Sequence, residues 1–183
     1  MKLTAVCVAV LCTLTTAFAL AQHATSPTGA KGPTPDIHYV PTSNGVADAM
    51  LKLANTTSSD VVYDLGSGDG RIVIAAAKKF GARGVGVELD AGLIKDATKN
   101  TAKAGVADKV TFRQEDLFKT DLSDATVVTL YLSNSINIRL RSLLQQQLKP
   151  GSRVVSHRFE MGDWTPDATV RLEGTSVHLW TIR

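Results

Sequence analysis

The residues with the clearest chemical meaning lie at positions 64–70, where Asp64 is followed by glycine at every second position. A short hydrophobic run at 61–63 precedes this acid, and a helix-like apolar run begins at Ile72. A turn of this kind between a strand and a helix exposes backbone N–H groups and lets a ligand approach the main chain closely. The pattern therefore predicts a nucleotide-type cofactor site built from Asp64, Gly66, Ser67, Gly68 and Gly70.

Two nucleotide-binding motifs compete for this stretch. The dinucleotide fingerprint is Gly-x-Gly-x-x-Gly, and Gly66 and Gly68 fit its first two positions. Its third position falls on Arg71, because Gly70 comes one place too early. The pattern acid-x-Gly-x-Gly-x-Gly, by contrast, is met without exception. The spacing therefore counts against a nicotinamide dinucleotide as the cofactor.

The acid-x-Gly-x-Gly-x-Gly pattern resembles the first motif of class I S-adenosylmethionine-dependent methyltransferases, and later motifs follow in that family's order. Glu88 ends the second expected strand, where the family's acid accepts the ribose hydroxyl protons. Asp116 and Leu117 follow the third expected strand, where the family places an acid near the adenine amino group. The resemblance covers roughly residues 37–183 and implies S-adenosyl-L-methionine as the cofactor.

Three stretches resemble, more narrowly, a branch of seven-strand protein-lysine methyltransferases that includes mitochondrial enzymes acting on membrane-protein lysines. They are residues 39–42, residues 61–72, and residues 153–159 running on to 164–166. The resemblance implies transfer of a methyl group to a protein lysine. It also implies that the first stretch closes over the methionine end of the cofactor through Tyr39, Pro41 and Thr42.

The residues after the fourth expected strand bear on the methyl acceptor. Small-amine and nucleic-acid N-methyltransferases often carry Asp/Asn-Pro-Pro-aromatic there, whereas residues 131–134 read Tyr-Leu-Ser-Asn. We predict that Tyr131 walls an apolar pocket, in which burial lowers the pKa of a lysine amine. We also predict that Asn134, or alternatively Ser133, holds the incoming amine by hydrogen bonding. The alternative is that Ser133 or Asn134 caps the helix that follows.

Each candidate also has a structural interpretation. Asp64 could cap the glycine turn, Glu88 could be a solvated strand end, and Asp116 could cap a short helical turn. The pocket could also be lined by three later residues, His157, Phe159 and Trp164, and His157 could supply a base. All three could equally be core residues.

Strands and helices alternate from Ile37 onward. The expected strands are 60–65, 84–88, 110–114, 126–132 and 153–159, and the expected helices begin at 43 or 44 and span 71–80, 93–104 and 136–148. This alternation predicts a parallel sheet with helices on both faces. Residues 168–172 and 177–182 predict a closing hairpin. The expected fold class is therefore α/β, a Rossmann-like, doubly wound, mostly parallel seven-stranded sheet with a C-terminal antiparallel hairpin.

The N-terminus has the form of an export signal. Lys2 precedes an apolar, threonine-rich run, and Ala19-Leu20-Ala21 fits a secretory cleavage site. We predict a signal peptide at 1–21, a flexible tether at 22–36 and a methyltransferase domain at 37–183. The protein is then exported, periplasmic or secreted, or anchored to the inner membrane if the signal is retained. Export conflicts with a cofactor that is made in the cytoplasm.

The composition of the chain limits the classes of partner that we expect it to bind. The net charge is +3, aromatic residues make up 5%, and no run of Lys or Arg occurs, so nucleic-acid binding has little support. Both cysteines, Cys7 and Cys12, lie in the signal, so cleavage leaves no thiol and no thiolate metal site. We expect no metal, a monomer and a protein substrate, with membrane contact only if the N-terminal segment is retained. A small-molecule methyltransferase and a non-catalytic exported binding protein are the alternatives.

Overall fold

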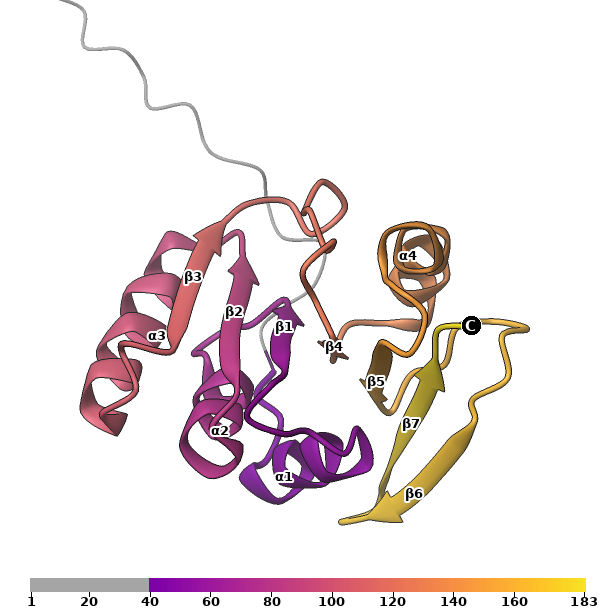
Figure 1. Ribbon diagram of the computed structural model, residues 1–183, viewed down its shortest axis with the longest axis horizontal. Coiled ribbons are helices and arrows are strands. Elements are labelled where there is room, and N and C mark those ends of the chain that lie inside the picture. The colour runs from indigo at the N-terminus through magenta and orange to yellow at the C-terminus, as the bar shows by residue number, and fades with distance from the viewer. Residues whose placement is uncertain (1–39) are drawn as a thin grey trace, which may run out of the picture. The chain divides into compact units, whose positions relative to one another are not determined.

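The computed structural model describes residues 40–183 (Figure 1). The predicted signal at 1–21, the tether at 22–36 and Tyr39 lie outside the described residues. The elements are α1 (Asn44–Leu53), β1 (Val61–Leu65), α2 (Arg71–Phe80), β2 (Arg83–Glu88), α3 (Ala91–Ala104), β3 (Val110–Gln114), β4 (Val127–Leu130), α4 (Asn134–Gln147), β5 (Arg153–His157), β6 (Ala168–Leu172) and β7 (Thr175–Thr181).

All seven strands form one sheet in the order β3-β2-β1-β4-β5-β7-β6. Strands β1 to β5 are parallel, whereas β7 runs antiparallel to both β5 and β6. The chain proceeds outward from β1 through β2 to β3, and then returns to place β4 on the other side of β1. The carboxyl ends of β1 and β4 therefore form a topological switch point, where open α/β sheets bind ligands. This order confirms the predicted fold class.

Helices cover both faces of the sheet because the central strands are buried on both sides. All five residues of β1 are buried. On one face, Met50 of α1 and Ile72 of α2 pack in a cluster with Val62. On the other face, Leu140 of α4 packs in a cluster with Tyr63. Within residues 40–183, no helix has the length and apolar character needed to cross a bilayer.

Side-chain caps fix where three of the described helices begin, and Asp90 is the cap of α3. Ser43 caps α1, its Oγ accepting a hydrogen bond from the backbone N–H of Val46 at 3.1 Å. Ser133 caps α4 in the same way through the N–H of Ile136 at 3.3 Å. Such caps each contribute about 1 kcal/mol. The choice left open by the sequence is thus settled at α4, where Ser133 is the cap and Asn134 is the first helical residue.

Strand β5 is two residues shorter than expected. It ends at His157 because Arg158 has a φ of 69°, a left-handed conformation that is uncommon for any residue except glycine. The N–H of Phe159 donates back to the carbonyl oxygen of His157 at 2.8 Å, so the chain reverses around a single residue. Strand β4 is also shorter and ends at Leu130, where the chain leaves the sheet toward α4.

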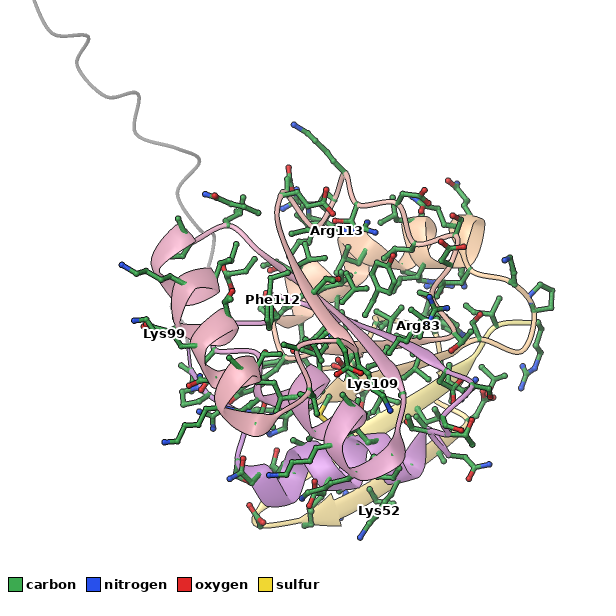
Figure 2. The ribbon with its side chains drawn as sticks, turned by 60° about the vertical axis from the view of Figure 1, so that its left-hand side comes forward. Lys52, Arg83, Lys99, Lys109, Phe112 and Arg113 are labelled. Atoms are coloured by element: carbon green, nitrogen blue, oxygen red, sulfur yellow. The ribbon has the colours of Figure 1, made fainter. Side chains whose placement is uncertain are left out.

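Edge strand β3 supports the glycine turn from one side. Figure 2 shows Phe112 and Arg113 leaving this strand on opposite sides, as strand alternation requires. Arg113 lies over the ring of Tyr63, with its Cζ atom 5.4 Å from the ring centroid. Phe112 lies against the glycine turn, and a Cβ added to Gly70 would meet its Cζ atom at 2.6 Å. Only glycine leaves room for this ring.

Candidate active site

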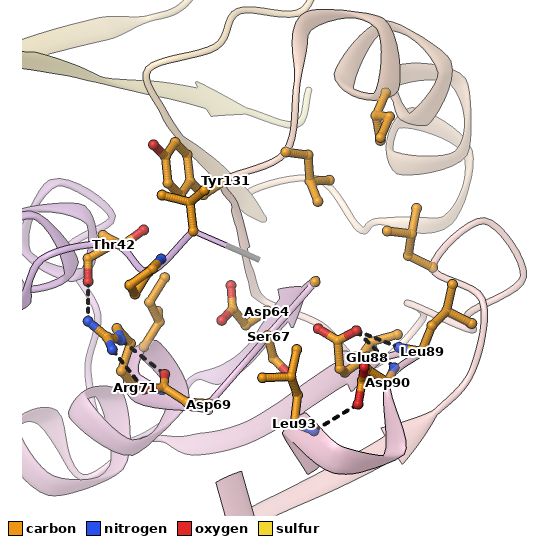
Figure 3. A pocket seen from close by; sticks show the side chains of 18 of the residues that line it. Thr42, Asp64, Ser67, Asp69, Arg71, Glu88, Leu89, Asp90, Leu93 and Tyr131 are labelled. Carbon is orange, nitrogen blue, oxygen red and sulfur yellow. Dashed lines mark hydrogen bonds and ion pairs between the residues drawn. The ribbon is translucent and has the colours of Figure 1, made fainter. Parts of the chain in front are cut away.

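A cavity of about 410 Å³ opens at the carboxyl ends of β1, β2 and β4, at the topological switch point (Figure 3). Its volume lies in the range of small-molecule and cofactor sites. Nine of the predicted site residues line it: Pro41, Thr42, Asp64, Gly66, Ser67, Glu88, Asp116, Leu117 and Tyr131. Three others that the structure describes do not: Gly68, Gly70 and Asn134. Residues separated by most of the chain therefore meet in one cavity.

The glycine turn is fixed by backbone geometry. Gly66, Gly68 and Gly70 have φ values of 79°, 52° and 79°, all in the left-handed region that favours glycine. The N–H groups of Gly66 and Ser67 both donate to the carbonyl oxygen of Val87 at 2.9 Å, which ties the turn to β2. The Oγ of Ser67 is buried without a hydrogen-bond partner among the described residues.

Glu88 is held in place by the main chain. One carboxylate oxygen accepts from the N–H of Gly68 at 3.0 Å, which explains the contribution of a glycine outside the cavity lining. The other accepts from the N–H groups of Leu89 and Asp90 at 2.8 and 3.1 Å. Three backbone donors thus orient the carboxyl group of Glu88 at this end of the cavity. Glu88 is therefore not simply a solvated strand end, because both of its carboxyl oxygens accept hydrogen bonds from the main chain.

Asp64 places a carboxyl group in the buried floor of the cavity. Only 3% of the residue is exposed, and one carboxyl oxygen accepts from the Oγ1 of Thr129 at 2.7 Å. Burial raises its pKa to about 7, the bond from Thr129 lowers the pKa, and the charges of Glu88 and Asp69 raise it. A buried carboxyl group with this pKa is stabilised in its charged form by a cationic ligand.

The cavity carries an excess of negative charge. One arginine lines it, Arg71, whose guanidinium contacts Asp69 at 2.7 Å and donates to the carbonyl oxygen of Thr42 at 2.8 Å. Six carboxyl groups line it: Asp64, Asp69, Glu88, Asp90, Glu115 and Asp116. A dinucleotide would bring its pyrophosphate against these groups. S-adenosylmethionine carries a sulfonium and an ammonium beside one carboxylate, so its charge complements the cavity.

Asp116 both lines the cavity and caps a turn. Its Oδ1 accepts from the N–H of Phe118 at 2.9 Å, while its carbonyl oxygen accepts from the N–H of Lys119 at 2.8 Å. Leu117, the next residue, is half-buried against the core cluster under α4 and also faces the cavity. The two interpretations of Asp116 are therefore compatible, because the turn presents the carboxylate to the cavity.

Tyr131 forms the cavity wall at the end away from Glu88, on the side of Thr42 (Figure 3). Its ring stacks on His157, with centroids 3.9 Å apart and planes at 28°. Phe159 stacks with Tyr131 at 6.0 Å, but neither His157 nor Phe159 lines the cavity. Tyr131 is thus the member of this aromatic stack that lines the cavity.

Two other residues predicted near the acceptor lie elsewhere. The carboxamide oxygen of Asn134 accepts from the N–H of Glu160 at 3.2 Å, and Asn134 does not line the cavity. Its predicted hold on the amine stays a prediction. Trp164 packs against Trp180 in the core, with ring centroids 5.9 Å apart. Trp164 is therefore a core residue in this structure.

Sequence reasoning missed several residues of the cavity wall. Arg71 directly follows the glycine motif, and this position was the available signal for it. Leu132 and Ile136 looked like core residues, because an apolar residue beside a cavity has the same pattern as one beside another helix. Val40 lies in the stretch 39–42 that the resemblance placed over the cofactor, although it was not itself predicted as a site residue, and Leu93 was expected only as an apolar helix residue. Phe118 gave no signal.

A doubly wound sheet, a glycine turn after β1, an acid after β2 and a negatively charged cavity at the switch point define a class I methyltransferase that uses S-adenosylmethionine. The model of the ANTKMT methyltransferase domain family matches residues 64–168, more than half of the chain. The chain belongs to this family.

Relatives carry the same chemistry in their names. A protein-lysine N-methyltransferase of Saccharolobus islandicus is 44% identical over 153 residues, which cover 81% of this chain and 95% of that protein. The adenine nucleotide translocase lysine N-methyltransferase of Mus musculus is 37% identical over 139 residues. That match covers 76% of this chain but only 60% of the mouse protein.

One similar solved structure is named for a different methyl acceptor. A crystal structure described as an RNA methyltransferase from Salinibacter ruber, in complex with S-adenosyl-L-homocysteine, is 62% identical and has a TM-score of 0.77. The match covers 78% of this chain and 94% of that chain. The similar proteins are therefore all named as methyltransferases and differ in the acceptor that they are named for.

Proposed function

We propose that this protein transfers a methyl group from S-adenosylmethionine to the ε-amine of a lysine in a protein. The observation that carries this proposal is the apolar wall that Tyr131, Leu132 and Ile136 form at the acceptor end of the cavity. The alkyl part of a lysine side chain packs against such a wall, whereas an RNA strand brings phosphates that the carboxyl groups of the cavity repel. The names of the archaeal and mouse relatives support the same acceptor.

For methyl transfer, the protein has mainly to align the lysine amine with the cofactor and to allow the amine to lose its proton. The cofactor, when bound, supplies a methyl group already activated by its sulfonium for in-line displacement. The chain aligns the amine with that methyl group, and alignment alone can supply a large share of the rate. Tyr131, Leu132 and Ile136 give this part of the wall an apolar surface, which disfavours the ammonium form of the lysine and lowers its pKa. The amine loses its proton to solvent before transfer.

His157 is not the base in this scheme. Its Nδ1 lies 3.2 Å from the Oγ1 of Thr42 and its Nε2 lies 3.1 Å from the Oγ1 of Thr175. Both ring nitrogens are therefore engaged, and the ring lies behind Tyr131 outside the cavity lining. Of the two interpretations left open by the sequence, the geometry supports the structural one.

Export and the oligomeric state remain part of the proposal. Residues 1–21 have the form of a signal peptide and lie outside the described residues, so the proposed exported location rests on their sequence alone. We propose that the protein acts as a monomer and contacts a membrane only if this segment is retained.

The test is methyl transfer from radiolabelled S-adenosylmethionine by the full-length chain into separate host membrane-protein, soluble-protein, RNA and small-molecule fractions. Glu88→Gln serves as the control. We expect a labelled protein band that protease removes, ribonuclease leaves, and Glu88→Gln fails to produce, with methyl-lysine found by mass spectrometry. Label found only in RNA, or only in small molecules, would show that the methyl acceptor belongs to that fraction and is not a protein lysine. No label in any fraction, with no calorimetric binding of S-adenosylhomocysteine, would mean a non-catalytic protein on this fold.

A further inference from the structure

Residues 40–42, here called the strap, cover one side of the cavity and are held from two directions. All three strap residues line the cavity. Thr42 is buried, and its carbonyl oxygen accepts from Arg71 at 2.8 Å. Its hydroxyl lies 3.2 Å from the Nδ1 of His157, a residue 115 positions later in the chain. The strap is therefore tied to α2 through a main-chain atom and to β5 through a side chain.

His157 also supports Tyr131, which lies at the same end of the cavity as the strap. Its ring face stacks on Tyr131 at 3.9 Å, directly behind the part of the wall that the cavity exposes. The two residues meet because β4 and β5 pair in parallel with Leu130 opposite Ser156, so Tyr131 and His157 follow at adjacent positions. One imidazole thus contacts both the strap and the tyrosine wall.

The chain after His157 completes the support of Tyr131. The left-handed turn at Arg158 brings Phe159 back beside Tyr131, with ring centroids 6.0 Å apart. The side chain of Asn137 on α4 holds this turn, donating to the Oγ of Ser156 and to the carbonyl oxygen of Phe159. A strained one-residue reversal that is fixed by a buried amide is typical of a functional site.

The chemical state of His157 matches a positioning role. Burial and the charge of Arg158 lower the pKa of its ring, so the imidazole is neutral near pH 7. A neutral ring donates from one nitrogen and accepts at the other. The hydroxyls of Thr42 and Thr175 satisfy either arrangement, because each can donate or accept.

We propose that His157 is a positioning residue with two separable roles: Nδ1 holds the strap over the cofactor cavity, and the ring face fixes Tyr131 as the wall for the acceptor. The second role rests on the proposed function, whereas the first concerns the cofactor alone. The two roles use different parts of one side chain. Substitutions that keep one part and remove the other will separate them.

His157→Phe keeps a ring face for Tyr131 and removes the bond to Thr42. We expect this variant to bind S-adenosylhomocysteine about five- to tenfold more weakly by calorimetry, as loss of one buried hydrogen bond implies. We expect its KM for S-adenosylmethionine to rise by the same factor, with little change in the maximal rate of label transfer into the protein fraction that the wild type labels.

His157→Asn keeps a polar atom near the Nδ1 position and removes the ring. We expect it to bind S-adenosylhomocysteine within about twofold of the wild type, because the bond to Thr42 is retained. We expect its maximal rate at saturating S-adenosylmethionine to fall about tenfold or more, because Tyr131 loses its support and the amine is misaligned.

The matched control is His178→Phe on β7. His178 is also buried, is also bonded to a threonine (Nδ1 to Thr169 Oγ1, 2.9 Å) and also contacts an aromatic ring, that of Trp180. Unlike Thr42 and Tyr131, however, neither Thr169 nor Trp180 lines the cavity. We expect this variant to lose stability in urea unfolding without weakening S-adenosylhomocysteine binding.

Three outcomes would overturn the proposal. Equal losses of binding in His157→Phe and His157→Asn would show that the two roles are not separable. An equal loss in His178→Phe would show that binding follows overall stability. Unchanged binding in His157→Phe would remove the strap role. If the wild type labels no protein at all, the proposed function fails and the acceptor role fails with it, while calorimetry still decides the strap role.

Discussion

The two ends of the cavity are built in different ways. At the cofactor end, the glycine turn and Glu88 are fixed by hydrogen bonds that main-chain N–H groups donate, such as that from Gly68 to the carboxylate of Glu88. At the acceptor end, Thr42, Tyr131 and His157 come from separate segments and are joined by side chains. A site held by main chain depends on a few acids and glycines. A site held by side chains depends on each contact between distant segments.

The two ends also differ in charge. Glu88 and Asp116 are ionisable and face the cavity at the cofactor end, whereas Tyr131, Leu132 and Ile136 give the acceptor end an aromatic and aliphatic wall. The polar end suits recognition of ribose and amino groups, and the apolar end suits a neutral amine. Asp64 lies in the buried floor and is the most electrostatically perturbed group of the cavity.

The largest expected effect is the change in folding stability with pH that Asp64 causes. Its pKa rises from 3.8 to about 7 on folding, so the folded state binds more protons than the unfolded state between these values. Its contribution to stability is therefore complete below about pH 4 and is lost as pH rises through about 7. Asp64→Asn removes this dependence. The wild type should lose about 4 kcal/mol of unfolding free energy relative to the variant over this range.

Urea unfolding of both proteins from pH 4 to pH 8 measures this difference. The same linkage predicts that the wild type binds S-adenosylhomocysteine more weakly as pH falls below about 7, because the ligand's ammonium favours ionised Asp64. A difference in unfolding free energy that does not change with pH would show that the carboxyl group is ionised throughout.

The second effect tests how closely the cofactor end is packed. Gly70→Ala places a Cβ 2.6 Å from Phe112 at a residue with a φ of 79°. We expect about 3 kcal/mol of destabilisation, from left-handed strain and overpacking together. Gly105→Ala is the control, because its φ is 73° but nothing lies within 4 Å of the added Cβ. It should lose about 1 kcal/mol. Equal losses in thermal unfolding would assign the whole effect to the backbone.

The third prediction distinguishes the specific contribution of the Glu88 carboxylate from the contribution of the net negative charge of the cavity. Glu88→Gln replaces an acceptor of three backbone N–H groups by an amide with one acceptor oxygen. We expect S-adenosylhomocysteine to bind about 50-fold more weakly by calorimetry, as for loss of hydrogen bonds to a charged group. Glu115→Gln removes the same charge from another lining position and should cost less than about fivefold. Similar losses in both would mean that only the net charge matters.

The smallest effect compares two helix caps. Ser43→Ala and Ser133→Ala each remove an N-cap and should each cost about 1 kcal/mol of unfolding free energy. Ser43 directly follows the strap, and its hydroxyl also donates to Glu173 in the turn between β6 and β7. We expect only Ser43→Ala to weaken S-adenosylhomocysteine binding, by about twofold. Equal binding of S-adenosylhomocysteine by the two variants would show that the start of α1 does not influence the cofactor end of the cavity.

Local patterns predicted much of the fold. Residues 71–80, 110–114 and 168–172 form elements with the expected bounds, because glycines and a change of hydrophobic period mark their ends. The prediction for β5 was wrong at its end. Nothing in the local sequence of residues 153–159 signals that the chain turns back at Arg158.

The sequence by itself determined the cofactor end, because each of its devices is local: three left-handed glycines, an acid before them and an acid at the end of the next strand. Only the tertiary structure decided the acceptor end. It placed His157 between Thr42 and Tyr131, and it turned Asn134 toward Glu160. The physical reason is that contacts between distant segments depend on strand register and on the path of the chain, which no short pattern of residues specifies.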